Sequence, residues 1–154
     1  MKKIIAYMLL LALALGLVAC GGSQTAEVDI LQVKADIIEG LAVADPLDLP
    51  AERLLDLYGI ESAWVKSSAC FITMGGAFPD EIVMVEAVDT ASADSIGQKL
   101  ETRLADVKNQ AQNYDAESFA LLEKCKVTVK GVYVTLFISA KSAGMQEIFD
   151  SAAK

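Results

Sequence analysis

The chain has 154 residues, 54% of them hydrophobic, with 13 basic and 21 acidic side chains that give a formal net charge of −8. This length predicts a single folded domain, and the acidic balance argues against nucleic acid and anionic lipid headgroups as partners. The sequence contains no histidine, which removes Ser-His-Asp and Cys-His catalysis and most catalytic zinc sites.

The N-terminal residues have the layout of a secretory signal. Two lysines precede an apolar run from Ile4 to Val18, which is shorter than the ~20 apolar residues that span a bilayer. Leu17-Val18-Ala19-Cys20 matches the lipobox of bacterial lipoproteins, in which the cysteine thiol takes a diacylglyceryl group before cleavage. We therefore predict a signal peptide over residues 1–19. We also predict a lipid on Cys20 that holds the protein on the extracytoplasmic face of the cell membrane.

The mature chain begins with a tether and two helices. Residues 20–27 comprise the lipidated cysteine and a short Gly/Ser-rich segment that spans roughly 15 Å as a flexible coil. Residues 28–154 are expected to form one α+β domain. Asp29 followed by Gln32 is a variant of the capping box, and apolar spacing predicts a first helix from about Ile30 to Ala42. Ala44 to Leu49 is expected to form a break between helices. A second, short helix is expected to begin at Pro50 and to end with Gly59 in a left-handed cap.

A β-hairpin is predicted next. Residues 63–72 are rich in aromatic and β-inclined side chains, with serines suited to a solvated face. The glycines and the proline of Met74–Asp80 indicate the hairpin loop. The second strand, from about Glu81 to Val88, is apolar at both alternating positions, which is typical of a strand covered on both faces. We therefore expect it to lie in the interior of the sheet.

The second half of the chain repeats the pattern of strands and helices. Ile96 to Ala111 gives the clearest amphipathic helix, and Asp115 is expected to cap a short helix after it. Val127 to Ile138 predicts a second hairpin with a tight turn at Gly131. Apolar spacing over Met145 to Ala152 predicts a final helix.

These elements predict an α+β fold in which two N-terminal helices precede two ββα units. The sheet is expected to have four mainly antiparallel strands, with the helices packed largely on one face. Cys70 and Cys125 remain once Cys20 carries lipid. An exported pair permits a disulfide, but we favour two buried free thiols because a domain of this length needs no covalent cross-link.

Several short motifs resemble a known family. They are Tyr58-Gly59-Ile60, Pro79-Asp80-Glu81-Ile82, Asp89 and Lys130-Gly131-Val132-Tyr133-Val134, all behind a lipobox. Together they resemble the small Gram-positive lipoproteins that carry domain of unknown function 4358, over roughly Ile30 to Ala152. Pro79 departs from the pattern, since similar proteins more often have a small residue there. The resemblance implies a membrane-anchored extracytoplasmic protein, and it brings no assigned activity.

Four carboxylates are the candidates for chemistry, because Walker, GxGxxG and GxSxG motifs do not occur. They lie in and around the second predicted strand: Asp80, Glu81, Glu86 and Asp89. Two carboxylates can serve as general acid and base or bind Ca²⁺, but the spacing here selects no geometry. We therefore assign no catalytic residue, no metal site and no cofactor.

Structural roles are favoured for these carboxylates. Glu81 and Asp89 flank the strand and are expected to solvate its end and to cap the following helix. Glu86 interrupts an apolar run. We expect it on a partly solvated face, and the alternative is burial beside Lys126 or Lys130.

Two aromatic residues, Trp64 and Phe78, are candidates for a contact loop, because exposed aromatic side chains mark contact surfaces. Core packing is the alternative for both. The favoured function is a binding or interaction module that holds a protein or wall-polymer partner at the cell surface. The alternative is a carboxylate-dependent hydrolase acting on cell-wall or exported polymers.

Overall fold

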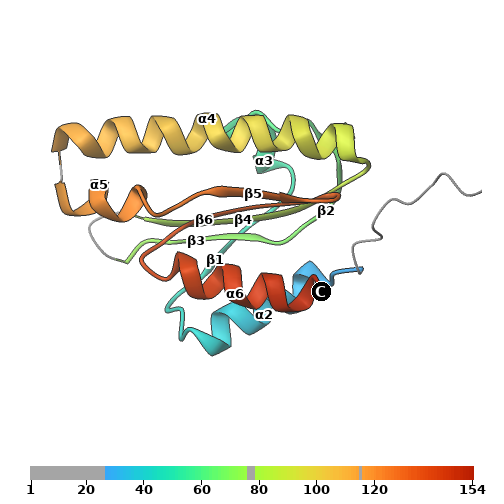
Figure 1. Ribbon diagram of the computed structural model, residues 1–154, viewed down its shortest axis with the longest axis horizontal. Helices are drawn as coiled ribbons and strands as arrows, with labels where there is room; N and C mark the ends of the chain where they lie inside the picture. The colour runs from blue at the N-terminus through green and yellow to red at the C-terminus, as the bar shows by residue number, and fades with distance from the viewer. Residues whose placement is uncertain (1–26, 76–78, 115) are drawn as a thin grey trace, which may run out of the picture.

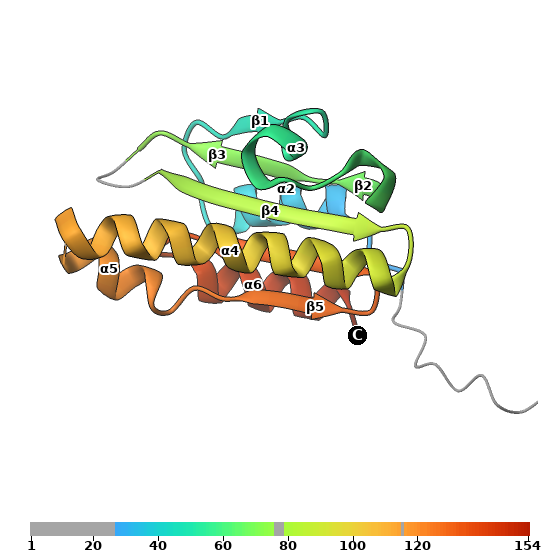
Figure 2. The same ribbon diagram turned by 90° about the horizontal axis from the view of Figure 1, so that it is seen from above.

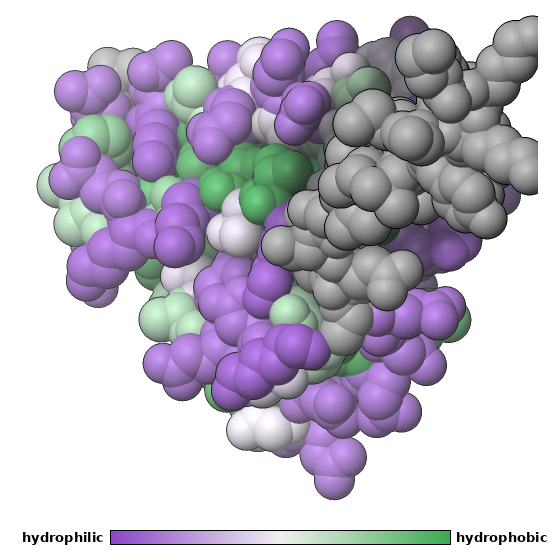
Figure 3. All heavy atoms as spheres, turned by 45° about the vertical axis from the view of Figure 1, so that its right-hand side comes forward, coloured by the Kyte–Doolittle hydropathy of each residue, from purple (hydrophilic) through white to green (hydrophobic). Residues whose placement is uncertain are grey.

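A computed structural model describes residues 27–75, 79–114 and 116–154. An antiparallel sheet lies between two layers of helices (Figures 1 and 2), and the face drawn in Figure 3 is mainly hydrophilic. The elements in chain order are α2 (Ile30–Gly40), β1 (Leu47–Leu49), α3 (Arg53–Tyr58), a 3₁₀ turn (Ser62–Trp64), β2 (Val65–Ser68), β3 (Cys70–Thr73), β4 (Asp80–Ala87), α4 (Thr90–Tyr114), α5 (Ala116–Leu122), β5 (Val127–Lys130), β6 (Tyr133–Ile138) and α6 (Ser142–Ala152).

The sheet is built around β4. Its strand order is β1-β3-β4-β6-β5, and β2 also pairs with β4. Ser68 lies opposite Val85 and Phe71 opposite Ile82, so β2 and β3 keep one register and form two parts of the same hairpin arm. On its other edge β4 pairs with β6. The predicted hairpins and the interior position of the second predicted strand are therefore confirmed.

The number of strands was predicted wrongly, because the sheet has six strands rather than four. One predicted strand is divided into β2 and β3 near Ala69. The segment Leu47–Leu49 was expected to be a break between helices, yet it pairs with β3 as β1. Three residues are too few to show an alternating pattern, so only the neighbouring strand reveals it.

The expectation that helices pack largely on one face is also wrong. Helices α3, α4 and α5 lie on one face, and α2 and α6 lie on the other (Figure 1). Alternation along β4 explains this arrangement, because Val83 and Val85 face α4 while Ile82 and Met84 face α2 and α6. Each set needs its own apolar cover.

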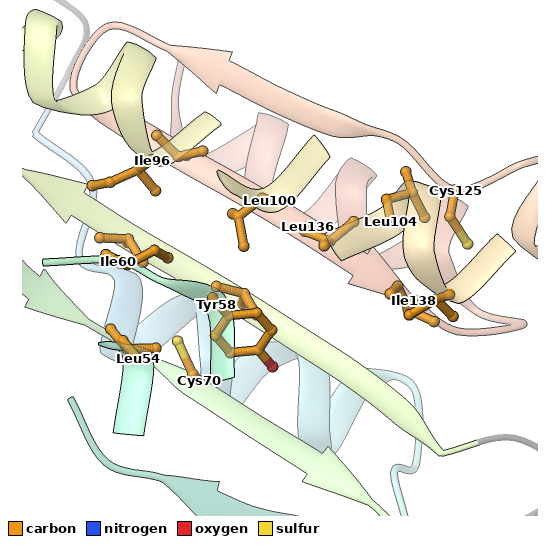
Figure 4. Packing of buried hydrophobic residues seen from close by; sticks show 14 of the residues in the cluster. Leu54, Tyr58, Ile60, Cys70, Ile96, Leu100, Leu104, Cys125, Leu136 and Ile138 are labelled. Atoms are coloured by element: carbon orange, nitrogen blue, oxygen red, sulfur yellow. The ribbon is translucent and has the colours of Figure 1, made fainter. Parts of the chain in front are cut away.

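The larger apolar cluster lies under α4 (Figure 4). Its labelled members are Leu54, Tyr58, Ile60, Cys70, Ile96, Leu100, Leu104, Cys125, Leu136 and Ile138. Cys70 and Cys125 are both free and buried, as expected, and Figure 4 shows them in separate parts of the cluster. The second cluster joins Ile30, Val33 and Ile37 of α2 to Met145 and Phe149 of α6.

Local signals at the helix ends are confirmed where the structure describes them. Asp29 accepts hydrogen bonds from the backbone N–H groups of Leu31 (3.1 Å) and Gln32 (3.0 Å) at the start of α2. Asp89 accepts from the Ser92 N–H (2.7 Å) at the start of α4, and this bond lowers the pKa of Asp89. Gly59 ends α3 with φ of 68°, a conformation that favours glycine. The predicted cap at Asp115 lies outside the described residues.

Both helical layers are expected to contribute comparably to stability. Leu100→Ala in α4 and Met145→Ala in α6 each remove a fully buried side chain, so each should lower the free energy of unfolding by about 2–5 kcal/mol. Leu31→Ala is the control, because Leu31 is 64% exposed and its loss should change the value by less than about 0.5 kcal/mol. Urea denaturation measures all three. A Met145→Ala variant as stable as the control would contradict the packing of α6.

Candidate functional site

Of the two aromatic residues proposed for a contact loop, Trp64 lies in the described part of the chain. Phe78 lies outside the described residues, as does Cys20. Trp64 is half-buried and packs against the cluster under α4, and its carbonyl oxygen accepts from the Val88 N–H at 3.0 Å. Trp64 precedes the start of β2, whereas Gly75 follows the end of β3 at the other end of the same hairpin arm. Trp64 is therefore a packing residue here.

The carboxylates of β4 do not converge. Glu86 lies on the same face of the strand as Ile82 and Met84, and Glu81 points to α4 on the other face. Asp80, the first residue of the strand, lies beside Ser118 of α5 and Ser139. Asp80 and Glu86 are six residues apart, or roughly 20 Å along an extended strand. Paired carboxylates of glycoside hydrolases are about 5–9.5 Å apart. The arrangement therefore provides no acid and base on a common substrate.

Glu81 is buried in an ionic network rather than solvating the strand end. It is only 7% exposed. Arg103 of α4 donates to both carboxylate oxygens of Glu81, from Nε to Oε2 at 3.1 Å and from Nη2 to Oε1. The Tyr58 hydroxyl donates to Oε2 at 3.3 Å. Burial, reinforced by the Glu81 charge, raises the pKa of Tyr58. The network joins α3 and α4 to β4.

Glu86 is also buried, at 9% exposure, which corrects the expectation of a partly solvated face. Its partners are Lys66 and Ser67 of β2, at 2.7 and 2.8 Å, rather than Lys126 or Lys130. Burial alone would raise the pKa of Glu86, but the hydrogen bonds from Lys66 and Ser67 and the Lys66 charge outweigh it and lower the pKa. This network holds β2 against β4 beside the start of the domain.

Asp80 lies beside a small cavity at the other end of β4. The cavity is about 30 Å³ in volume and is also lined by Ser118, Ile138 and Ser139. Burial raises the pKa of Asp80, against hydrogen bonds from Ser139 and Thr73. Because this volume is that of about one water molecule, it suits no larger ligand.

Strand β5 forms an open edge of the sheet (Figure 2). A two-residue turn at Gly131 joins Lys130 to its partner Tyr133, so this pair exchanges the first hydrogen bonds of the hairpin. Alternation then makes Thr128 bond to β6 as well and turns the main-chain groups of Val127 and Val129 outward. In the described part of the chain, no strand pairs with these outward groups.

The opposite edge, β1, is less accessible to a partner. It has three residues, and Lys34 of α2 reaches across to bind Asp48 of β1 at 2.6 Å. The β5 edge is therefore a better candidate for docking than the β1 edge.

A groove lies on each side of the β5 edge. The α4 groove, between α4 and β5, has a volume of about 470 Å³. Its lining residues are Asp94, Gly97, Gln98, Glu101, Val127 and Val129. The apolar floor is open to solvent, since Val129 is 45% exposed, and Figure 3 shows apolar side chains between hydrophilic ones on this side of the molecule.

The α6 groove lies on the other face of the sheet and has a volume of about 330 Å³. Its lining residues are Lys124, Lys126, Phe137, Ala140, Ser142, Ala143, Gln146, Glu147 and Asp150. The side-chain oxygen Oε1 of Gln146 accepts from the hydroxyls of Thr128 (3.2 Å) and Thr135 (3.4 Å), and its Nε2 donates to Asp150 at 3.2 Å. These bonds fix α6 beneath the edge strand.

Sequence reasoning missed this edge as a site. The alternation of Val127 and Val129 with Lys126, Thr128 and Lys130 was visible and predicted a strand. Its position at the edge depends on the strand order, which the sequence does not give.

The ion pair of Glu86 predicts a pH-dependent stability difference. A depressed carboxyl pKa stabilises the fold above the unfolded-state pKa, about 4.3 for Glu, and this contribution is lost as the pH falls through the folded-state pKa. Lys66→Met should therefore lower Tm at pH 7, and the difference from the wild type should shrink by pH 3. Circular dichroism melts at both pH values measure this. Equal differences at both pH values would contradict the role assigned to Lys66.

Residues 27–75, 79–114 and 116–154 contain no group of three or more Cys, Asp or Glu side chains placed to hold a metal ion. The helices that the structure describes include none long and apolar enough to cross a membrane.

Comparison with known proteins identifies the family. The model of the Domain of unknown function (DUF4358) family matches residues 31–139, a range that runs from α2 to the end of β6 and includes β4 and the β5 edge. Neither a curated protein nor a solved structure matches the chain. Because the match covers most of the sequence, the chain belongs to the Domain of unknown function (DUF4358) family.

Proposed function

We propose that this protein is a lipid-anchored interaction module on the extracytoplasmic face of the cell membrane, of the kind found among small Gram-positive lipoproteins. Lipid on Cys20 anchors it, and the β5 edge binds a protein or wall-polymer partner. The observation that carries the binding role is the open edge of β5 with a groove on each face of the sheet. Extended chains commonly bind at such edges.

The start of the domain supports a short anchor. The N–H of Val28 donates to the Tyr133 hydroxyl at 2.9 Å, so the chain is attached to the sheet eight residues after Cys20. The described chain begins near the same end of the molecule as the C-terminus (Figure 1). With a tether of roughly 15 Å, that end lies next to the bilayer and the end with the β3–β4 connection lies away from it.

The hydrolase alternative gains no support from the geometry. Its carboxylates are divided between two faces of β4, and Glu81 and Glu86 already bind cations of the same domain. The interaction module is therefore favoured over the hydrolase.

The anchor is tested by fractionation. Cys20→Ala should abolish lipid attachment and cleavage of the signal peptide. The mature membrane-bound form should therefore be lost, because the lipid is the anchoring group. Metabolic labelling with a fatty-acid analogue and mass spectrometry of the N-terminus measure this. A Cys20→Ala protein that is cleaved at the same bond and stays in the membrane would refute the anchor.

The binding role is tested by site-specific photo-crosslinking on intact cells. A photoreactive amino acid at Gln98, in the α4 groove, should capture a discrete partner. The same group at Glu39, exposed on α2, is the matched control, and Phe78 tests the loop proposed from sequence. Absence of any crosslinked partner at all three positions would overturn the binding role. A partner captured only at Phe78 would move the site to that loop.

A further inference from the structure

We infer that the partner contributes an extended segment with basic side chains at alternate positions, which adds to β5 as a further strand and places those side chains in the α4 groove. This inference rests on the proposed binding function and specifies the chemistry of the ligand. Three features of the β5 edge lead to it: its outward main chain, the composition of the α4 groove and the charges on the opposite face.

The main chain of β5 offers a partner strand its hydrogen bonds. The groups of Val127 and Val129 point away from β6, and each residue presents one N–H donor and one C=O acceptor. An added strand would satisfy them and would lie between α4 and α6. Its successive side chains would then enter the α4 groove and the α6 groove in turn, because side chains alternate between the two faces of a sheet.

The α4 groove suits a long cationic side chain. Val127 and Val129 form an apolar floor, and the charged lining residues are both acidic, Asp94 and Glu101. A Lys or Arg side chain can lay its methylene groups on the valines and carry its charge to the carboxylates. Asp94 and Glu101 are seven residues apart, or about 10 Å along the helix. This leaves room for two side chains spaced about 7 Å apart along a strand.

Gly97 keeps this groove open. A Cβ added at Gly97 would lie 3.0 Å from Cγ2 of Val129, which is closer than side chains normally approach. Any larger residue at position 97 would therefore push against Val129. The groove has its depth because glycine stands here.

The α6 face of β5 restricts which side chains the added segment can carry at its other alternate positions. Lys126 lines the α6 groove, and Lys130 shares its alternating position on β5. The charged lining residues of the α6 groove are two lysines, Lys124 and Lys126, and two carboxylates, Glu147 and Asp150. The groove therefore offers a cationic side chain no net attraction, and these alternate positions should be uncharged. The apolar ring of Phe137 in the α6 groove favours the same choice. The ligand is therefore alternately basic and neutral rather than uniformly basic.

Charge argues against a second copy of this chain as the occupant. Antiparallel pairing of β5 with itself about Thr128 would place Lys126 of one copy opposite Lys130 of the other, and like charges directly opposite destabilise a sheet. The acidic rim formed by Asp94 and Glu101 would likewise receive no basic side chain from Val127 or Val129.

The direct test uses defined peptides and the full-length lipidated protein in detergent micelles. The probe is a fluorescent heptapeptide that alternates threonine and arginine, with three arginines. Its Kd should be at least about tenfold lower than that of a peptide of the same composition with the arginines adjacent, a difference of about 1.4 kcal/mol. A peptide with glutamate in place of arginine should not bind. Fluorescence anisotropy measures each Kd.

Two protein variants separate main-chain from side-chain recognition. Val129→Pro removes an outward N–H without removing a bond to β6, a position where an edge strand tolerates proline, and should raise the Kd about tenfold. Asp94→Asn combined with Glu101→Gln should weaken binding and flatten its salt dependence. Glu39→Gln on α2 removes one charge elsewhere and should leave the Kd unchanged. Circular dichroism melts show that each variant is folded.

Several results would overturn the inference. They are equal affinity for the alternating and blocked arginine peptides, unchanged binding by folded Val129→Pro, or tighter binding of the glutamate peptide. A concentration-dependent dimer that Val129→Pro abolishes would show that a second copy occupies the edge. If a partner crosslinks at Gln98 but the peptides do not bind, the binding function stands and this ligand chemistry is wrong. If no partner crosslinks at any position, the proposed function itself fails.

Discussion

The burial of β4 on both faces and both edges is the constraint on which the rest of the domain depends. Hydrogen bonds to β2, β3 and β6 satisfy its main chain, and its alternating apolar side chains require two separate covers. Helix α4 supplies most of one cover, and α2 with α6 supplies the other. A domain with helices on one face alone would leave Ile82 and Met84 in water, which is why the three layers form together.

Two carboxylates interrupt this apolar strand, and each is neutralised by a cation from a different element. Arg103 comes from α4 and Lys66 from β2. A buried carboxylate without a partner is costly. The two ion pairs therefore hold α4 and β2 against β4. The same pairing occupies both carboxylates within the fold. Asp94 and Glu101, by contrast, face solvent beside Val127 and Val129 of the edge strand.

Strands β1 and β5, at the two ends of the strand order, differ in how accessible their outward main-chain groups are to a partner. Strand β1 is short and its Asp48 pairs with Lys34 of α2, whereas β5 lies between the α4 groove and the α6 groove. Lysines on edge strands normally discourage pairing with other chains, and on β5 they occupy one face only. The other face combines valines with an acidic rim. An edge of this kind discriminates between partners by the side-chain pattern of the added strand, while main-chain hydrogen bonds supply attraction common to any extended segment.

Local chemistry was sufficient to predict several parts of this protein from sequence. Apolar residues at both alternating positions of 81–88 predicted an interior strand, the periodicity of residues 96–111 predicted α4, and Asp29, Gly59 and Asp89 predicted helix ends. These signals act over one or two turns of chain, so they are readable without the fold. The tertiary structure alone decided that Leu47–Leu49 is a strand, that helices cover both faces, that Lys66 rather than a lysine near β5 pairs with Glu86, and that β5 is an edge. Each of these depends on which distant segments become neighbours, and side-chain periodicity carries no information about that choice.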